Sequence, residues 1–218
     1  MSTEVEQGSQ FDADYFLRGQ ASGKSLYKDY RWMPELTIPM CCAMVKYLEI
    51  AVNDRILDFG CARGYTVKAF REMGYDARGV DVSQWAIENA DDAVKKYVDE
   101  CPHNKLGVRL YDWVLAKDVL EHVPDAVEAV ANLMHTAKKG VFAVVPLSLS
   151  DGERYVIKCY EKDVTHIHRL PLPMWVAMFA RPGWEVTASY RVRGVKDNYW
   201  RPGMEMGNGF ITARRCEA

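Results

Sequence analysis

Short apolar runs alternate with amphipathic segments along the middle of the chain. The runs are rich in β-branched and aromatic residues and end at turn residues, which is typical of buried strands. They lie at residues 55–59, 77–82, 111–117 and 141–147. Between them, apolar residues recur at helical spacing, as Val67, Phe70 and Met73 do after the first run. Strands that alternate with helices predict a doubly wound, mostly parallel α/β sheet.

Turn and capping residues mark the ends of the expected helices. Gly74 is expected to stop the first one. Ser83 suits the N-cap of the second. Pro124 suits the first turn of a later helix, which we expect Gly140 to close. Residues 90–110 stay open, because periodicity allows either a continued helix to Glu100 or a short strand over residues 94–98.

The pattern changes after residue 147. A polar segment leads to a short helix near residues 174–180, followed by two strands at 184–193 and 209–216. Two strands joined by a loop are most simply antiparallel, so we expect a hairpin at the sheet edge. Residues 1–52 precede the first strand and are expected to form a helical cap over the ligand-binding edge. One domain of 1–218 would thus hold a cap, a cofactor-binding core at 53–147 and an acceptor-side segment at 148–218.

Composition places the chain among ordinary globular proteins. It has 218 residues, 49% hydrophobic and 27% charged, and its net charge of −2 favours no nucleic-acid backbone as partner. The start lacks a secretory signal pattern, and the longest apolar stretch, residues 36–45, is broken by Pro39 and too short to span a membrane. The six cysteines lack CxxC spacing. We therefore expect a cytoplasmic protein with reduced thiols.

The segment ILDFGCARGYTVKAF, residues 56–70, carries the candidate cofactor chemistry. Ligands of open parallel sheets bind beyond the carboxyl ends of the strands, where this glycine-containing loop falls. Gly60 and Gly64 let the backbone approach a ligand closely, and Asp81 is placed to accept hydrogen bonds from ribose hydroxyls. Ala62 replaces a middle glycine, which would cost little if its φ were negative.

Asp58 separates two cofactor classes. A dinucleotide lays its anionic pyrophosphate against the helix N-terminus, where a nearby carboxylate would repel it. S-adenosylmethionine brings a cationic ammonium and sulfonium group to this edge. The carboxylate therefore favours the sulfonium cofactor.

Three segments occur in an order that points to one family. ILDFGCARGYTVKAFREMGYDARGVDVSQWAIENA followed by YDWVLAKDVLEHVPD resembles the class I S-adenosylmethionine-dependent methyltransferases, whose usual pattern is LDxGCGxG, then GxDxS, then a DVLEHV-like segment. The resemblance covers residues 54–147. It implies a seven-stranded Rossmann-like sheet, S-adenosylmethionine as cofactor and S-adenosylhomocysteine as product.

The resemblance also implies a set of cofactor-binding residues that follow the strands. They are Asp58, Gly60 and Gly64 beside the methionine part, Cys61 and Ala62 through their backbone, Asp81 at the ribose, Val82 and Asp99 at the adenine, and Asp118 and Val119 between cofactor and acceptor. The acceptor walls are expected from aromatic residues of the cap and of the segment before the last strand, namely Tyr15, Tyr27, Tyr30, Trp32, Tyr199 and Trp200.

Histidines are the candidate bases. Methyl transfer is an in-line displacement that needs alignment of donor and acceptor, and a hydroxyl acceptor also benefits from a base. His122 follows the strand at 111–117, and His166 lies in a DxTH segment that covers the active-site mouth in similar methyltransferases. A bond from His166 to loop backbone is the alternative. We expect no metal at Asp163, His166 and His168, because alternate residues of an extended segment point to opposite sides.

The leading interpretation is methyl transfer to a small-molecule acceptor, such as a sugar, a metabolite or a carrier-bound intermediate. A nucleic-acid methyltransferase and a non-catalytic cofactor-binding partner protein are the alternatives. The segment after residue 117 is not the NPPY- or DPPY-like sequence that holds a flipped adenine, and no proline–cysteine nucleophile pair occurs. We expect neither nucleic acid nor membrane as a partner and leave the oligomeric state open.

Overall fold

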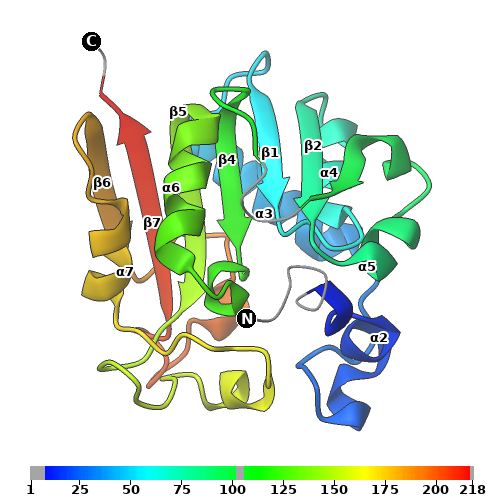
Figure 1. Cartoon of the computed structure of the whole chain (residues 1–218), viewed down its shortest axis with the longest axis vertical. Coiled ribbons are helices and arrows are strands. Elements are labelled where there is room, and N and C mark those ends of the chain that lie inside the picture. Colours follow the sequence, from blue (N-terminus) through cyan, green and yellow to red (C-terminus); the bar gives the residue numbers. More distant parts are fainter. Residues whose placement is uncertain (1–7, 102–105, 217–218) are drawn as a thin grey trace.

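A seven-stranded sheet in the order β3-β2-β1-β4-β5-β7-β6 forms the centre of the protein (Figure 1). The computed structural model describes residues 8–101 and 106–216. The strands are β1 (Arg55–Phe59), β2 (Asp76–Asp81), β3 (Val98–Glu100), β4 (Tyr111–Lys117), β5 (Ala137–Pro146), β6 (Trp184–Ser189) and β7 (Asn208–Arg215). The pairings among β1 to β5 are parallel, whereas β7 lies antiparallel to both β5 and β6. The predicted doubly wound sheet with an antiparallel C-terminal hairpin is confirmed.

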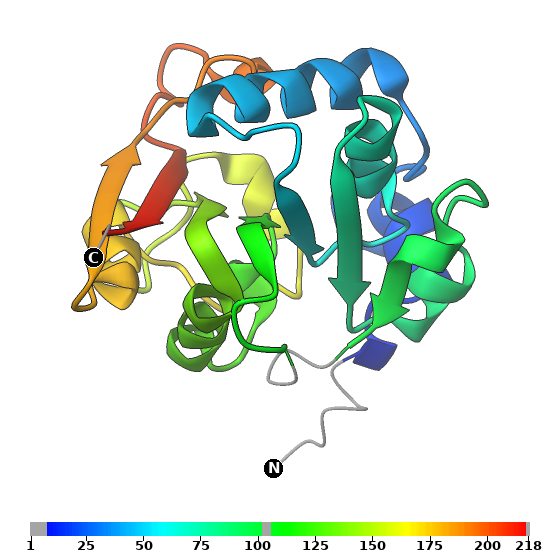
Figure 2. The ribbon, with the colours of Figure 1, turned by 90° about the horizontal axis from the view of Figure 1, so that it is seen from above.

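Helices cover both faces of the sheet (Figure 2). The α-helices are α2 (Ala13–Ser22), α3 (Pro34–Leu48), α4 (Tyr65–Glu72), α5 (Gln84–Glu88), α6 (Ala126–Thr136) and α7 (Leu172–Phe179). Short 3₁₀ turns are η1 (Lys95–Tyr97), η2 (Leu120–His122), η3 (Lys158–Lys162) and η4 (Asp197–Tyr199). None of the helices in the described parts of the chain is long and apolar enough to cross a bilayer.

Strand periodicity explains why the central strands are apolar throughout. In β1, Ile56 packs into the core beneath α3 and α4, and the next residue, Leu57, packs into the opposite core beneath α6 and α7. Leu115 and Val114 of β4 divide in the same way. Successive side chains of a strand point to opposite faces, so a strand covered on both sides needs apolar residues at every position.

Two of the four predicted helix signals, Ser83 and Gly74, are confirmed, and the other two are wrong. α6 begins at Ala126 with Asp125 as its N-cap, so Pro124 lies before the helix and not in its first turn. The Ser83 hydroxyl accepts from the Ala86 amide at 3.0 Å as the N-cap of α5, and Gly74 follows the end of α4. Gly140, expected to close a helix, instead lies inside β5. A Cβ at Gly140 would lie 2.5 Å from the Trp113 ring, so close packing of β5 on β4 accounts for this glycine.

The open segment before β4 contains a short strand. η1 leads into the three residues of β3, which pair in parallel with β2 from Gly79 onward. The short-strand alternative is therefore right in kind, although the strand begins where the expected one ends. Residues 102–105 of this segment, and the N-terminal residues 1–7 examined for a signal, lie outside the described residues.

The N-terminal helices have two different positions. α2 lies beyond the ends to which the arrows of β1 and β4 point, as expected for a cap (Figure 1). α3 instead runs along one face of the sheet (Figure 2) and buries Cys41, Met44 and Leu48 in the core that α4 shares. The expectation that all of residues 1–52 cap the ligand edge is therefore wrong for α3, because its apolar stripe covers a sheet face.

Candidate active site

A pocket lies at the carboxyl ends of β1, β2 and β4. The sheet side contributes Gly60, Ala62, Asp81, Val82, Asp118 and Val119. The opposite side is aromatic and comes from the N-terminal cap, with Phe11, Tyr15, Phe16 and Tyr27.

The loop after β1 is shaped by residues with positive φ. Gly60 has a φ of 76°, and a Cβ there would lie 2.4 Å from a methyl group of Val119. Ala62 has a φ of 48°, so the condition under which alanine would replace the middle glycine at little cost, a negative φ, is not met. Its amide donates a 2.7 Å hydrogen bond to Oδ2 of Asp81. This bond, made across 19 residues of sequence, holds the loop in the left-handed conformation.

Asp81 ends β2 and is fixed by two backbone amides. Oδ1 accepts from the Ser83 amide at 2.8 Å while Oδ2 accepts from Ala62. Burial raises the pKa of Asp81, and these amide bonds oppose the rise. A carboxylate has about four acceptor positions, so each oxygen keeps one for a ligand hydroxyl.

Asp58 lies in β1 and is only 5% exposed. Burial raises the pKa of its carboxyl to about 7, with the positive charge of Lys117 opposing the shift and the negative charge of Asp81 adding to it. Asp58, Cys61 and Gly64 belong to the strand and loop that shape the site but are not on the wall of the described pocket.

Asp99 is not at the site that the sequence predicted for it. It lies inside β3 opposite Val80, upstream of the carboxyl edge, and its side chain is 64% exposed. Its Oδ2 pairs with the Arg78 guanidinium at 3.2 Å. Cys101, two residues further on, lines the pocket instead.

Asp118 follows β4 and is held between two lysines. Its carboxylate oxygens lie 2.6 Å from Nζ of Lys117 and 2.5 Å from Nζ of Lys196. Burial alone would raise the pKa of Asp118, but the two ammonium groups outweigh it and hold the pKa well below its usual range. Sequence reasoning missed both lysines.

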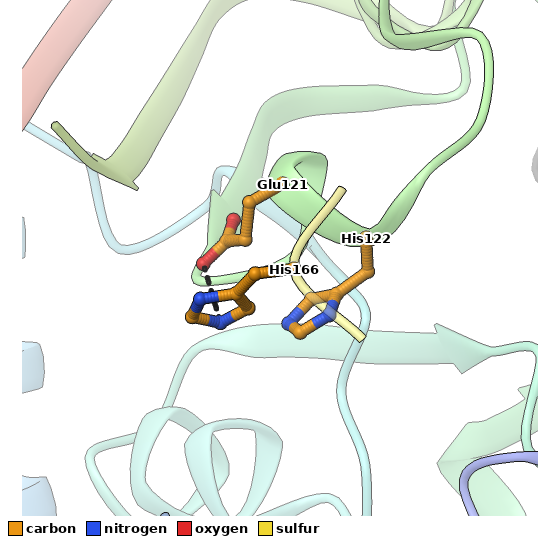
Figure 3. Close-up of side chains that lie close together, drawn as sticks. All are labelled: Glu121, His122 and His166. Atoms are coloured by element: carbon orange, nitrogen blue, oxygen red, sulfur yellow. Dashed lines mark ion pairs between the residues drawn. The ribbon is translucent and has the colours of Figure 1, made fainter. Parts of the chain in front are cut away.

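Two histidines meet beside this pocket (Figure 3). η2, directly after β4, carries Glu121 and His122, and residues 163–168 cross next to it with His166. The two imidazole centroids are 4.7 Å apart, and Nε2 of His166 lies 4.0 Å from Oε1 of Glu121 and 3.8 Å from Oδ2 of Asp163. His122 also lines the pocket, whereas His166 is not among its lining residues.

The hydrogen bonds around Thr165 fix the tautomer of His122. The Thr165 hydroxyl donates to Oδ1 of Asp163 at 2.5 Å, which uses its single hydrogen. Nδ1 of His122 lies 2.8 Å from that hydroxyl oxygen and 3.3 Å from the Thr165 carbonyl oxygen, both of which must accept. Nδ1 therefore carries the proton and Nε2 keeps a free lone pair. Burial, with the neighbouring His166, lowers the pKa of His122 to about 4, so the ring is neutral at pH 7.

The same Asp163 joins the cap to the histidine segment. The Tyr15 hydroxyl donates to its Oδ2 at 2.9 Å. Tyr15 and Tyr27 line the pocket, as expected of acceptor walls. The other aromatics proposed for the walls are not on the described pocket lining; Trp32 packs on Tyr65, for example, and Tyr199 on Tyr160.

Comparison with known proteins identifies the family. Residues 37–189 match a family described as a methyltransferase domain. A ubiquinone biosynthesis O-methyltransferase of Paraburkholderia phymatum is 28% identical over 167 residues, covering 66% of this chain and 68% of that protein. Across the curated relatives of this name, the covered share of their length runs from 37% to 68%.

Two solved structures share the fold. The 1,6-didemethyltoxoflavin N1-methyltransferase of Burkholderia thailandensis, with bound 1,6-didemethyltoxoflavin and S-adenosylhomocysteine, has a TM-score of 0.60 at 18% identity, covering 100% of this chain and 92% of that one. The [4+2]-cyclase SpnF has a TM-score of 0.69 at 15% identity, covering 100% and 98%. The family match extends over the cofactor loop, β2 and η2. The chain therefore belongs to the class I S-adenosylmethionine-dependent methyltransferases, and S-adenosylmethionine is its cofactor.

Proposed function

We propose that the protein transfers the methyl group of S-adenosylmethionine to a hydroxyl group of a small-molecule acceptor. The observation that carries this proposal is one shared pocket: Gly60 and Ala62 of the cofactor loop and Asp81 at the end of β2 line it together with His122. A methyl donor and a proton acceptor would thus meet in one cavity. The relatives named as O-methyltransferases favour oxygen over nitrogen as the acceptor atom.

The residues around the pocket fit the cofactor. Asp81 would accept from the ribose hydroxyls with the oxygen positions that its amide bonds leave open. Val82 would pack on the adenine. Asp58 would attract the ammonium group, and the backbone of Gly60 and Ala62 would approach the ligand closely. When bound, S-adenosylmethionine supplies a methyl group on a cationic sulfur.

The protein's own residues would align the acceptor and accept the proton of its hydroxyl group. The cap wall of Phe11, Tyr15 and Phe16 offers aromatic faces, which suit an acceptor that carries a ring. The hydroxyl proton would leave toward His122 and His166, which burial keeps neutral. Asp163, through Thr165, would hold the His122 ring in the tautomer whose Nε2 lone pair is free.

Isotope transfer tests this proposal. The protein is incubated with S-adenosylmethionine carrying a deuterated methyl group and with a panel of phenols, catechols, sugars, amines and nucleic acid, and products are identified by mass spectrometry. We expect the label on a hydroxyl oxygen of a small ring compound. At a cofactor concentration near the wild-type dissociation constant, Asp81→Asn should strongly reduce the transfer, and His135→Gln, an exposed change on α6, should leave it intact. Label only on an amine or on nucleic acid, or binding without transfer to any compound, would contradict the proposal.

A further inference from the structure

We propose that Glu121, His122 and His166 form a binding site for a divalent transition-metal ion of the Zn²⁺ type. One carboxylate oxygen and two imidazole nitrogens, one from each residue, lie within 4.8 Å of one another (Figure 3). This set differs from the Asp163, His166 and His168 combination judged from the sequence. His168 turns away, since its Nε2 lies 2.7 Å from the Val123 carbonyl oxygen.

The spacing suits a tetrahedral ion after a small adjustment. Zn²⁺ binds histidine nitrogen and carboxylate oxygen at about 2.0–2.2 Å, which puts neighbouring ligand atoms about 3.3 Å apart. Side-chain rotation that shortens the ligand-to-ligand distances, which are up to 4.8 Å, by at most about 1.5 Å would reach this distance. Two imidazoles and one carboxylate also match the ligand preference of zinc better than that of magnesium or calcium, which favour oxygen.

Polar atoms without partners point to a missing ligand. Nδ1 of His166 and Oε2 of Glu121 are buried and have no hydrogen-bond partner among the described residues. The Glu121 side chain is 1% exposed and that of His166 is 6% exposed. Buried polar groups are normally satisfied, and a buried carboxylate is costly without a cation or several donors. A bound ion would remove this cost for Glu121 and would engage His166.

The hydrogen bonds of His122 resemble those that orient a metal-binding histidine. Histidine ligands usually donate their second ring N–H to a neighbouring oxygen, which fixes the ring and leaves the other nitrogen for the metal. Nδ1 of His122 donates to Thr165, and Thr165 in turn donates to Asp163. The free Nε2 lone pair is therefore available for coordination.

Three protein ligands would leave a fourth position open. Catalytic zinc sites keep such a position for water or substrate, and structural sites close it. Because His122 lines the pocket, the acceptor's hydroxyl would bind at the open position; this use of the ion rests on the proposed function, whereas ion binding does not. With the ion bound, His122 and His166 are ligands, and the proton route through the histidines given under the proposed function is replaced: the ion would lower the pKa of the hydroxyl, and its proton would pass to water. The oxygen would then form its bond to the methyl carbon while the carbon–sulfur pair stays on sulfur.

Equilibrium dialysis of the full chain against Zn²⁺, with metal measured by mass spectrometry, tests the site. We expect one bound ion per chain. Glu121→Gln and His166→Gln should each weaken binding by about 100-fold or more. His168→Gln is the matched control on the same segment and should bind as the wild type does.

The wild-type protein gives a second readout that no folding defect can affect. Substitution by Co²⁺ should give the visible absorption of a four-coordinate site, and X-ray absorption should show nitrogen and oxygen neighbours. Sulfur neighbours would assign the ion to the cysteines and overturn the inference. Failure to retain Zn²⁺ at micromolar concentration, or equal binding by Glu121→Gln and His166→Gln when both are folded, would also overturn it. Methyl transfer that persists after complete chelation would refute the catalytic use of the ion and leave the proposed function standing.

Discussion

The Ala62 amide donates a 2.7 Å hydrogen bond to the Asp81 carboxylate while Ala62 holds a φ of 48°. The bond joins the loop after β1 to the end of β2, the two elements that shape the cofactor pocket. An alanine in this conformation is strained by roughly 1–2 kcal/mol because its Cβ crowds the following carbonyl. The loop therefore keeps its shape at the expense of stability.

Replacing Ala62 with glycine is expected to stabilise the fold slightly. Glycine removes the Cβ strain and loses part of the gain through the larger freedom of the unfolded chain, which leaves a net increase of up to about 1 kcal/mol in the free energy of unfolding. Urea denaturation measures it. Ala69→Gly in the middle of α4 is the control and should lose about 1 kcal/mol or more, because its φ is helical and its methyl is buried.

Asp81→Asn should weaken cofactor binding, whereas a matched change at the other end of β2 should not. An amide has one acceptor oxygen and no charge, so it cannot serve the two backbone amides and the ribose together. We expect the dissociation constant for S-adenosylhomocysteine to rise by about 10- to 100-fold in calorimetric titration. Asp76→Asn, at the other end of the same strand, should leave it unchanged. Equal affinities for the two variants would remove Asp81 from the ribose site.

Cofactor affinity should depend on pH through Asp58. Its pKa of about 7 means that the ionised fraction grows between pH 6 and pH 8, and only the ionised form attracts the cofactor's ammonium group. Affinity for S-adenosylhomocysteine should therefore rise by up to about tenfold over this interval and level off above it. Asp58→Asn should bind weakly at both pH values. An unchanged slope in this variant would show that another group titrates.

The same raised pKa has the opposite effect on the stability of the ligand-free protein. The folded state retains a proton on Asp58 that the unfolded chain loses near pH 4. Stability should therefore fall as pH rises from about 4 to 7, and this part of the decline should be absent in Asp58→Asn. Urea midpoints at several pH values measure the difference.

Tyr15→Phe should loosen the cap. The Tyr15 hydroxyl gives α2 a hydrogen bond to the buried Asp163 carboxylate, and losing a bond to a charged group costs about 1.5–3 kcal/mol. We expect this loss in the free energy of unfolding and faster amide exchange in α2. Tyr47→Phe on α3, where the side chain is 38% exposed, should change stability by less than about 0.5 kcal/mol. A comparable loss in both variants would show that the bond to Asp163 is not the cause.

The central strands could be predicted because each is an apolar run that ends at turn residues. β1 and β4 have the predicted bounds, since both faces of each strand are buried. β5 begins four residues earlier than the run at 141–147, because Lys138 and Lys139 interrupt the apolar pattern while the backbone already pairs with β4. The first residues of a strand therefore cannot be predicted from hydrophobicity when their side chains are exposed and polar.

The site could be predicted only where motif and strand order fix it. Asp81 is the last residue of β2 and is recognisable from its spacing to the loop. Lys196 reaches Asp118 across 78 residues, and no local pattern reports such a contact. Glu121 stands next to His122 in the sequence, yet its meeting with His166 arises from the path of residues 163–168. The conformation of Ala62 depends likewise on a distant carboxylate.

A crystal structure with S-adenosylhomocysteine tests the central claim, that one pocket holds the methyl donor beside the histidines, most directly. The account predicts ribose hydroxyls within hydrogen-bonding distance of Asp81 and the sulfur on the side of the pocket that His122 lines. A ligand bound elsewhere, or one whose sulfur faces away from His122 with the ribose clear of Asp81, would contradict it.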